Sequence, residues 1–70
     1  MDPKNPLNKY QKGTVLMTLE RFDEALEVLQ ELAHLVPREA PIHIMIGKIQ
    51  KKLGQKELAL QSFNKALDLD

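Results

Sequence analysis

The sequence contains two copies of one element, offset by 34 positions along the 70-residue chain. Several positions in the second copy carry the same residue type as their equivalents in the first. These pairs are Gly13 and Gly47, Leu19 and Leu53, Ala25 and Ala59, Leu26 and Leu60, and Leu35 and Leu69. An internal repeat constrains the fold strongly, because both copies must adopt the same conformation and bury apolar surface against each other.

Each copy has the apolar spacing of two α-helices. Asn5 can cap the first helix, with Pro6 at its first position. Pro37 ends the second helix, and Gly54 suits the left-handed residue that ends the third. The pattern therefore predicts an all-α chain with four antiparallel helices over residues 6–19, 22–36, 40–53 and 56–69.

A helix pair repeated every 34 residues resembles the tetratricopeptide repeat (TPR) family along the whole chain. The resemblance implies a two-repeat fragment of a right-handed α-solenoid. Its two units are expected at residues 6–39 and 40–70, with residues 1–5 as the end of a preceding repeat. Pro3 fits this division because it lies 34 positions before Pro37, the proline that closes the first unit.

The same resemblance assigns the positions at which the two helices of a unit meet. Glycine at positions 13 and 47 lets the partner helix approach, which outweighs the cost of about 1 kcal/mol for glycine inside a helix. We expect Gly47 to form its close contact with Ala59, and Leu67 to point inward with Ala59. The repeat-signature packing positions are Gly13, Ala25, Leu29, Leu32, Pro37, Gly47, Ala59, Phe63 and Ala66.

The residues that carry chemistry in enzymes are absent or scattered. The chain has no cysteine, which excludes a disulfide framework, a thiolate zinc site and a cysteine nucleophile. His34 and His43 lie on different helices with no second ligand at the right spacing, and Ser62 lacks the glycines of a nucleophile elbow. The acidic residues along the second helix form a solvated face: Glu20, Asp23, Glu24, Glu27 and Glu31. We therefore predict no enzyme, no cofactor or metal, and no small-molecule substrate.

The overall charge also limits the possible partners. Ten basic and ten acidic residues give a formal net charge of zero, which argues against a nucleic-acid binder of the basic type. The apolar runs are too short for a membrane span or a signal peptide. Proteins or peptides remain as the expected partners, in an intracellular setting that suits a chain without cysteine.

In the TPR family the first helices of successive units line a concave surface that binds an extended peptide or a partner helix. The resemblance places Tyr10, Thr14, Met17, Thr18, Ile44, Lys48, Lys51 and Lys52 on that surface. The three lysines share a helical face and can receive a carboxylate or an acidic segment; alternatively, they only solubilise a helix C-terminus. Carboxylate-clamp repeats need lysine and asparagine where this chain has Tyr10 and Thr14, which disfavours a chaperone adaptor.

A closer resemblance extends over both repeats. The stretches "DPKNPLNKYQKG", "ERFDEALEVLQELAHLVPREAP" and "IGKIQKKLGQKELALQSFNKALDLD" resemble the C-terminal TPR array of the scaffold subunits of the anaphase-promoting complex, a ubiquitin ligase, that receive coactivator tails. This implies a non-catalytic scaffold, nuclear or cytoplasmic, that binds partner subunits or coactivator tails on its concave face. The alternative is a structural or engineered two-repeat module whose surfaces serve stacking and self-assembly only.

Two repeats leave the outer faces of the first and last helices without a neighbour. A chain of this size without disulfides or metal is expected to need a further source of stability. We therefore expect a homo-oligomer through the exposed terminal helices, formed end to end or by helix exchange. The apolar residues expected on the last helix are Leu60, Phe63, Leu67 and Leu69.

Overall fold

The structure, a computed structural model, describes residues 5–69. This part of the chain folds into four α-helices and has no strand, which confirms the all-α prediction. The proposed end of a preceding repeat lies mostly outside the described residues, as do Pro3 and Asp70. The helices are α1 (Pro6–Thr18), α2 (Phe22–Leu35), α3 (Ala40–Lys52) and α4 (Lys56–Leu69).

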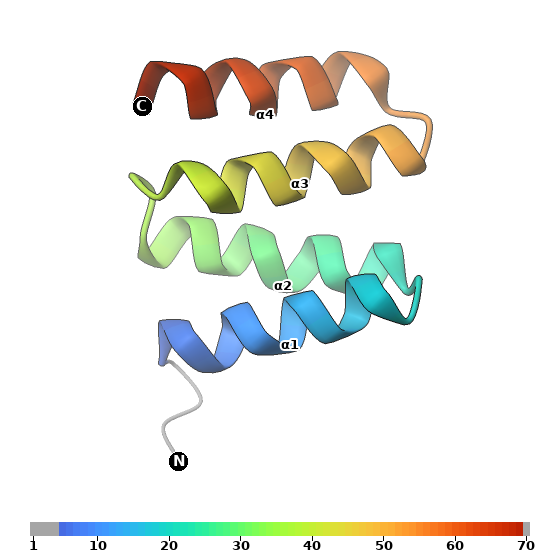
Figure 1. Cartoon of the computed structure of the whole chain (residues 1–70), viewed down its shortest axis with the longest axis vertical. Coiled ribbons are helices and arrows are strands. Elements are labelled where there is room, and N and C mark those ends of the chain that lie inside the picture. Colours follow the sequence, from blue (N-terminus) through green and yellow to red (C-terminus); the bar gives the residue numbers. More distant parts are fainter. Residues whose placement is uncertain (1–4, 70) are drawn as a thin grey trace.

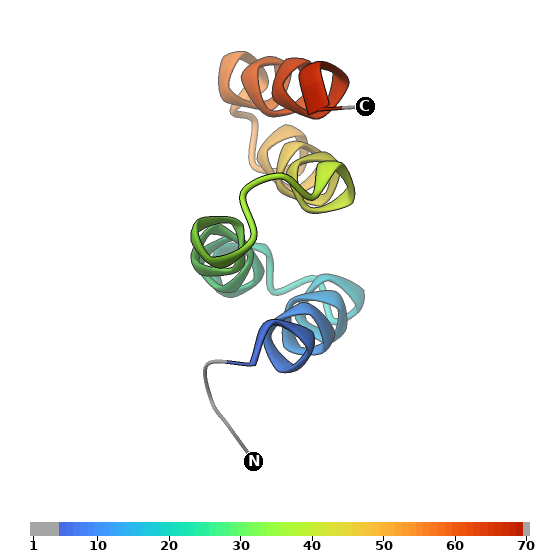
Figure 2. The ribbon, with the colours of Figure 1, turned by 90° about the vertical axis from the view of Figure 1, so that its left-hand side faces the viewer.

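The four helices are stacked in chain order, each antiparallel to the one before it (Figure 1). The main contacts join α1 to α2, α2 to α3, and α3 to α4. Seen from the side, the stack is a zigzag with α1 and α3 on one side and α2 and α4 on the other (Figure 2). The helices α2 and α3 are therefore packed on both sides, whereas α1 and α4 each have an outer face.

The ends of the helices follow local sequence signals. The Asn5 side chain accepts a hydrogen bond of 2.9 Å from the backbone N–H of Leu7, and Pro6 stands at the first helical position. Both features stabilise the start of α1, since its first N–H groups have no partner within the helix. Three helices end one residue before the expected position, because the residue there acts as the C-cap: Leu19, Val36 and Leu53.

The two turns within the repeats are closed in the same way. Gly54 has φ +81° and Glu20, 34 positions earlier, has φ +60°. After each of them, the next N–H donates to a carbonyl five residues back, from Arg21 to Leu16 at 2.9 Å and from Gln55 to Gln50 at 2.8 Å. This is the hydrogen-bond pattern of a Schellman motif, whose left-handed residue is normally glycine.

Because Glu20 occupies a conformation that L-residues disfavour, Glu20→Gly is expected to raise the free energy of unfolding by about 1 kcal/mol. The matched control is Gly54→Ala, which should lower it by a similar amount through the backbone alone, since no atom lies within 4 Å of the added Cβ. Urea unfolding followed by circular dichroism measures both. A destabilised Glu20→Gly variant would contradict this explanation of the turn.

The core joins the first three helices in one cluster. Leu29, Leu32 and Ile49 are the largest of its fully buried side chains. On α4 only Ala59 and Ala66 are buried among the apolar residues. The core cluster consists of Leu16, Ala25, Leu29, Leu32, Ile42, Ile46 and Ile49. Pro37, by contrast, is exposed in the connection between α2 and α3.

The two signature glycines mark the closest approach within each helix pair. A Cβ built on Gly13 would lie 2.7 Å from Leu29 Cδ2, and one built on Gly47 would lie 2.7 Å from Phe63 Cε1. The expected close contact of Gly47 with Ala59 is therefore wrong: Phe63, one turn further along α4, supplies the nearest atoms. The longer ring reaches the glycine where the alanine methyl does not.

The expectation that Leu67 points inward is also wrong. Its side chain is 71% exposed, and Leu60 is 61% exposed. The inward positions of α4 are filled by Ala59 and Ala66, so that Leu60 and Leu67 lie on the side of the helix turned away from α3. This outer face of α4 is left apolar and uncovered in the described chain.

Candidate protein-interaction face

The side of the stack formed by α1 and α3 carries a groove between the C-terminal ends of these two helices. We call it the α1–α3 groove. It brings together predicted residues from both repeats, Met17 and Thr18 from the first and the three lysines from the second. The lining residues are Met17, Thr18, Glu20, Phe22, Lys48, Ile49, Lys51 and Lys52.

Three other predicted residues do not line this groove. Tyr10, Thr14 and Ile44 are exposed on the same two helices but nearer their N-terminal halves. The Thr14 hydroxyl donates to the Tyr10 carbonyl at 2.9 Å, and Thr18 donates to the Thr14 carbonyl at 3.0 Å. These hydroxyls are thus bound to their own helix, as is common for threonine within helices.

Three residues of the groove were missed from the sequence. Phe22 and Ile49 supply partly and fully buried apolar surface, and Glu20 adds a carboxylate on the α1–α2 turn. Glu20 and Phe22 reach the groove because the left-handed turn at Glu20 brings the chain back beside α1. The repeat offset from Gly54 was the signal that could have located this turn.

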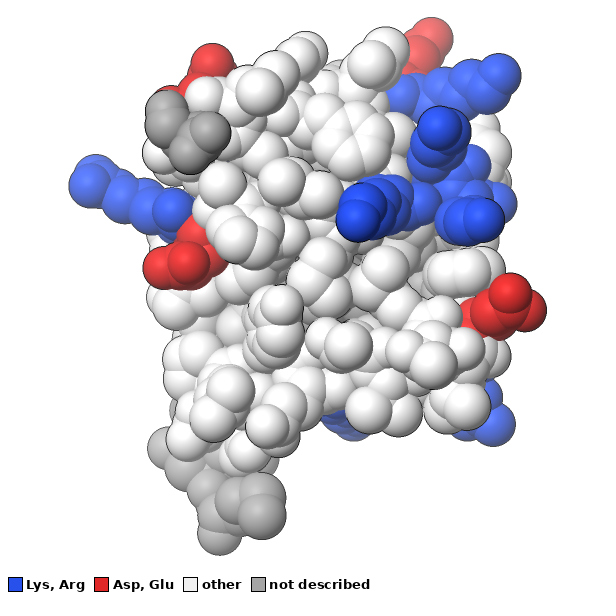
Figure 3. Space-filling model, viewed as in Figure 1, with Lys and Arg blue, Asp and Glu red and all other residues white. Residues whose placement is uncertain are grey.

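The charges around the groove are unevenly distributed. Lys48, Lys51 and Lys52 line it, and Lys56 begins the next helix. Within residues 5–69, none of these four lysines forms an ion pair. Figure 3, which views the α1–α3 side, shows positive side chains gathered at one edge next to a broad uncharged area. Lys51 and Lys52 lie in the last turn of α3, where they also favour the helix dipole.

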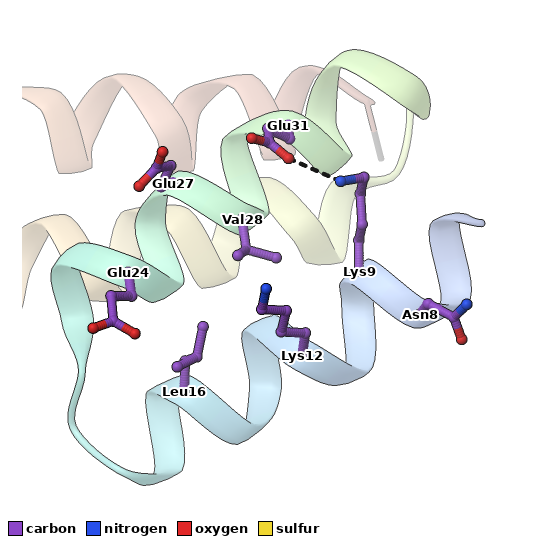
Figure 4. A pocket seen from close by; sticks show the side chains of 8 residues that line it. All are labelled: Asn8, Lys9, Lys12, Leu16, Glu24, Glu27, Val28 and Glu31. Atoms are coloured by element: carbon purple, nitrogen blue, oxygen red, sulfur yellow. Dashed lines mark hydrogen bonds and ion pairs between the residues drawn. The ribbon is translucent and has the colours of Figure 1, made fainter. Parts of the chain in front are cut away.

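A second groove lies at the outer end of the stack, between α1 and α2 (Figure 4), and we call it the α1–α2 groove. Its centre is the ion pair between Lys9 Nζ and Glu31 Oε2, at 2.8 Å. The hydrogen bond from Lys9 and its positive charge lower the pKa of the Glu31 carboxyl, and Lys12 contributes to this shift. The lining residues are Asn8, Lys9, Lys12, Leu16, Glu24, Glu27, Val28 and Glu31.

The histidines and the serine have structural surroundings. His43 is buried, and its Nε2–H donates to the Pro37 carbonyl at 2.9 Å; the carbonyl can only accept, which fixes the proton on Nε2. The Ser62 hydroxyl donates to the buried Gln50 Oε1 at 2.7 Å. His34 lies beside His43 in a shallow groove, a proximity that the sequence did not reveal. Across residues 5–69 no cluster of metal-ligating side chains is found.

Hydrophobic length was examined in the same part of the chain. None of its helices combines the length and apolar character needed to cross a lipid bilayer.

The stacked antiparallel helix pairs, the matched Schellman turns and the glycine approach in each pair define an α-helical repeat protein of the solenoid class. The family model of the tetratricopeptide repeat matches residues 8–34 and 40–70. The chain therefore belongs to the tetratricopeptide repeat family, and the predicted fold of two TPR units is confirmed.

Known proteins agree with this assignment. The chain is 39% identical over its full length to anaphase-promoting complex subunit 3 of Dictyostelium discoideum, and covers 7% of it. It is 43% identical to cell division cycle protein 27 homolog A of Arabidopsis thaliana, with 97% of this chain and 10% of that protein covered. The predicted resemblance to subunits of this complex is thus confirmed. The chain spans a tenth or less of the length of these relatives.

A solved structure supports the fold independently of those relatives. The solved structure of MamA AMB-1 superimposes on 99% of this chain with a TM-score of 0.93 at 35% sequence identity. The matched region is 41% of the MamA chain. The same stack of helix pairs therefore occurs in another protein of the repeat class.

Proposed function

We propose that this chain is a non-catalytic protein-interaction scaffold, a TPR segment of an anaphase-promoting complex subunit, that binds partner subunits or coactivator tails through the α1–α3 groove. The observation that carries the proposal is the groove itself. It places apolar surface from both repeats beside three lysines that have no acidic partner in the described chain. The likeness to subunit 3 of that complex supports the choice of partner.

The groove suits a short peptide segment with mixed character. An apolar side chain can contact Met17, Phe22 and Ile49, which form the apolar part of the lining. A carboxylate, from an acidic side chain or a chain terminus, can pair with the lysines on the α3 side. Glu20 on the other side can accept a hydrogen bond from a basic group of the peptide. The peptide's orientation would be fixed by these opposite charges.

The alternative, a module that serves only stacking, explains the apolar outer face of α4 but gives no role to the groove. A scaffold role needs no cofactor and no bound small molecule, and it places the protein with the complex in the nucleus or cytoplasm. The homologous subunits support this location by their names alone.

The lysines provide the test. Lys48→Glu combined with Lys52→Glu should weaken binding of a fluorescent coactivator tail peptide by about tenfold at low salt, and the difference should shrink as salt is raised. Both lysines are exposed, so helicity by circular dichroism should be unchanged. Fluorescence anisotropy measures the affinity.

The control for this experiment carries the same change in net charge elsewhere. Arg38→Glu combined with Lys65→Glu alters exposed residues outside the groove. This control should bind like the parent chain. Equal affinity of the parent and the Lys48→Glu, Lys52→Glu variant at every salt concentration would refute a role for the groove lysines.

A further inference from the structure

The outer face of α4 carries an apolar stripe without a cover. Leu60, Phe63 and Leu67 form it, at intervals of three and four residues. Leu60 and Leu67 are among the most exposed large apolar side chains of the described chain. Only uncharged residues separate their rows, with Asn64 beside them. This spacing is that of a helix–helix seam, in which such a stripe packs against another helix.

The first repeat shows what kind of surface covers this stripe. By the 34-residue offset, the equivalents of Leu60, Phe63 and Leu67 in α2 are Leu26, Leu29 and Ala33. These residues are buried or partly buried in the core that α2 shares with α3. On the α3 side the buried residues of that core are Ile42, Ile46 and Ile49. The surface that fits is therefore strongly apolar.

The chain's own α1 does not offer such a surface to a second copy. The residues equivalent to the three isoleucines of α3 are Asn8, Lys12 and Val15. Two of the three positions are thus polar or charged, and they border the α1–α2 groove with its ion pair between Lys9 and Glu31. Stacking α4 of one copy on α1 of the next would bury Lys12 and this pair against leucines, which is costly.

We propose that two copies of this chain associate symmetrically through α4, with the two α4 helices antiparallel and the Leu60, Phe63 and Leu67 stripes facing each other. The same surface serves on both sides, so the contact closes as a dimer and does not extend into a filament. A two-fold axis across the helices also sets the two helix dipoles in opposite directions. This differs from the end-to-end expectation and does not depend on the proposed ligand of the α1–α3 groove.

Two charge substitutions distinguish the modes of association. Leu67→Glu places a charge within the α4 stripe, and should raise the dimer dissociation constant by roughly tenfold or more in sedimentation equilibrium. Val15→Glu changes an equally exposed apolar residue on α1, at the position equivalent to Ile49, and should leave the dimer intact. An end-to-end contact would respond to both variants, and a helix-exchanged dimer to neither.

Cysteine cross-linking gives a second and independent readout, because the chain contains no cysteine of its own. Asn64→Cys, beside the stripe, should form a disulfide-linked dimer with itself under mild oxidation. Gln11→Cys, exposed on α1, should not. A chain that stays monomeric at all concentrations, a dimer weakened by Val15→Glu, or an Asn64→Cys variant that links only when mixed with Gln11→Cys would each overturn the proposal.

Discussion

Replacing Leu32 by alanine is expected to lower the free energy of unfolding by about 2–5 kcal/mol, a large part of the stability of a chain this short. Leu32 is 1% exposed and lies in the cluster that joins α1, α2 and α3. The shorter side chain loses apolar contacts and leaves a cavity at a place where helices pack on both sides of α2. Urea unfolding at one fixed protein concentration measures the change.

The matched control is Leu35→Ala, which makes the same substitution one turn further along α2. Leu35 is 46% exposed. Its loss should cost well under half of the change at Leu32, because little apolar area returns to water. Equal effects of the two substitutions would contradict the assignment of Leu32 to the shared core and of Leu35 to its edge.

The second large effect is expected at Gly13. Gly13→Ala should destabilise the fold by about 1–3 kcal/mol, even though alanine is the better helix former. The new Cβ would lie 2.7 Å from Leu29 Cδ2 and 2.9 Å from Leu29 Cγ. Leu29 is 0% exposed and enclosed by the core, so it has no free space into which to move. The helices α1 and α2 must therefore separate slightly.

The equivalent substitution in the second repeat should behave differently. Gly47→Ala meets the Phe63 ring, at 2.7 Å from Cε1. This ring is only partly buried and borders the uncovered face of α4, so it can turn outward. The gain in helix propensity, about 1 kcal/mol, should then offset most of the clash. A destabilisation by Gly47→Ala as large as that by Gly13→Ala would show that Phe63 is held as firmly as Leu29.

The helices could be predicted from the sequence because their limits depend on local residue types. Pro6, Pro37 and Gly54 act through their own backbone preferences, and these do not depend on the rest of the fold. Glu20 is the exception, since glutamate does not favour the left-handed region that it occupies. Only its place 34 residues before Gly54 identifies that turn.

Contacts between helices were harder to predict. The lysines at 48, 51 and 52 share a face by helical spacing alone, and the structure adds Met17 to them. Phe22 and Ile49 complete the groove only because α1 and α3 lie on the same side of α2, which no local pattern encodes. The inward prediction for Leu67 failed for a related reason: an apolar residue on an end helix has the pattern of a core residue although nothing covers it.

The most direct measurement of the central claim, recognition through the α1–α3 groove, is a titration of the isotope-labelled chain with a coactivator tail peptide, followed by NMR. The account predicts saturable shifts of the backbone amides of Thr18, Lys48 and Lys52, which border the groove. Amides on the opposite side, such as those of His34 and Lys65, should stay unchanged. Shifts confined to that opposite side, or no shifts at saturating peptide, would contradict it.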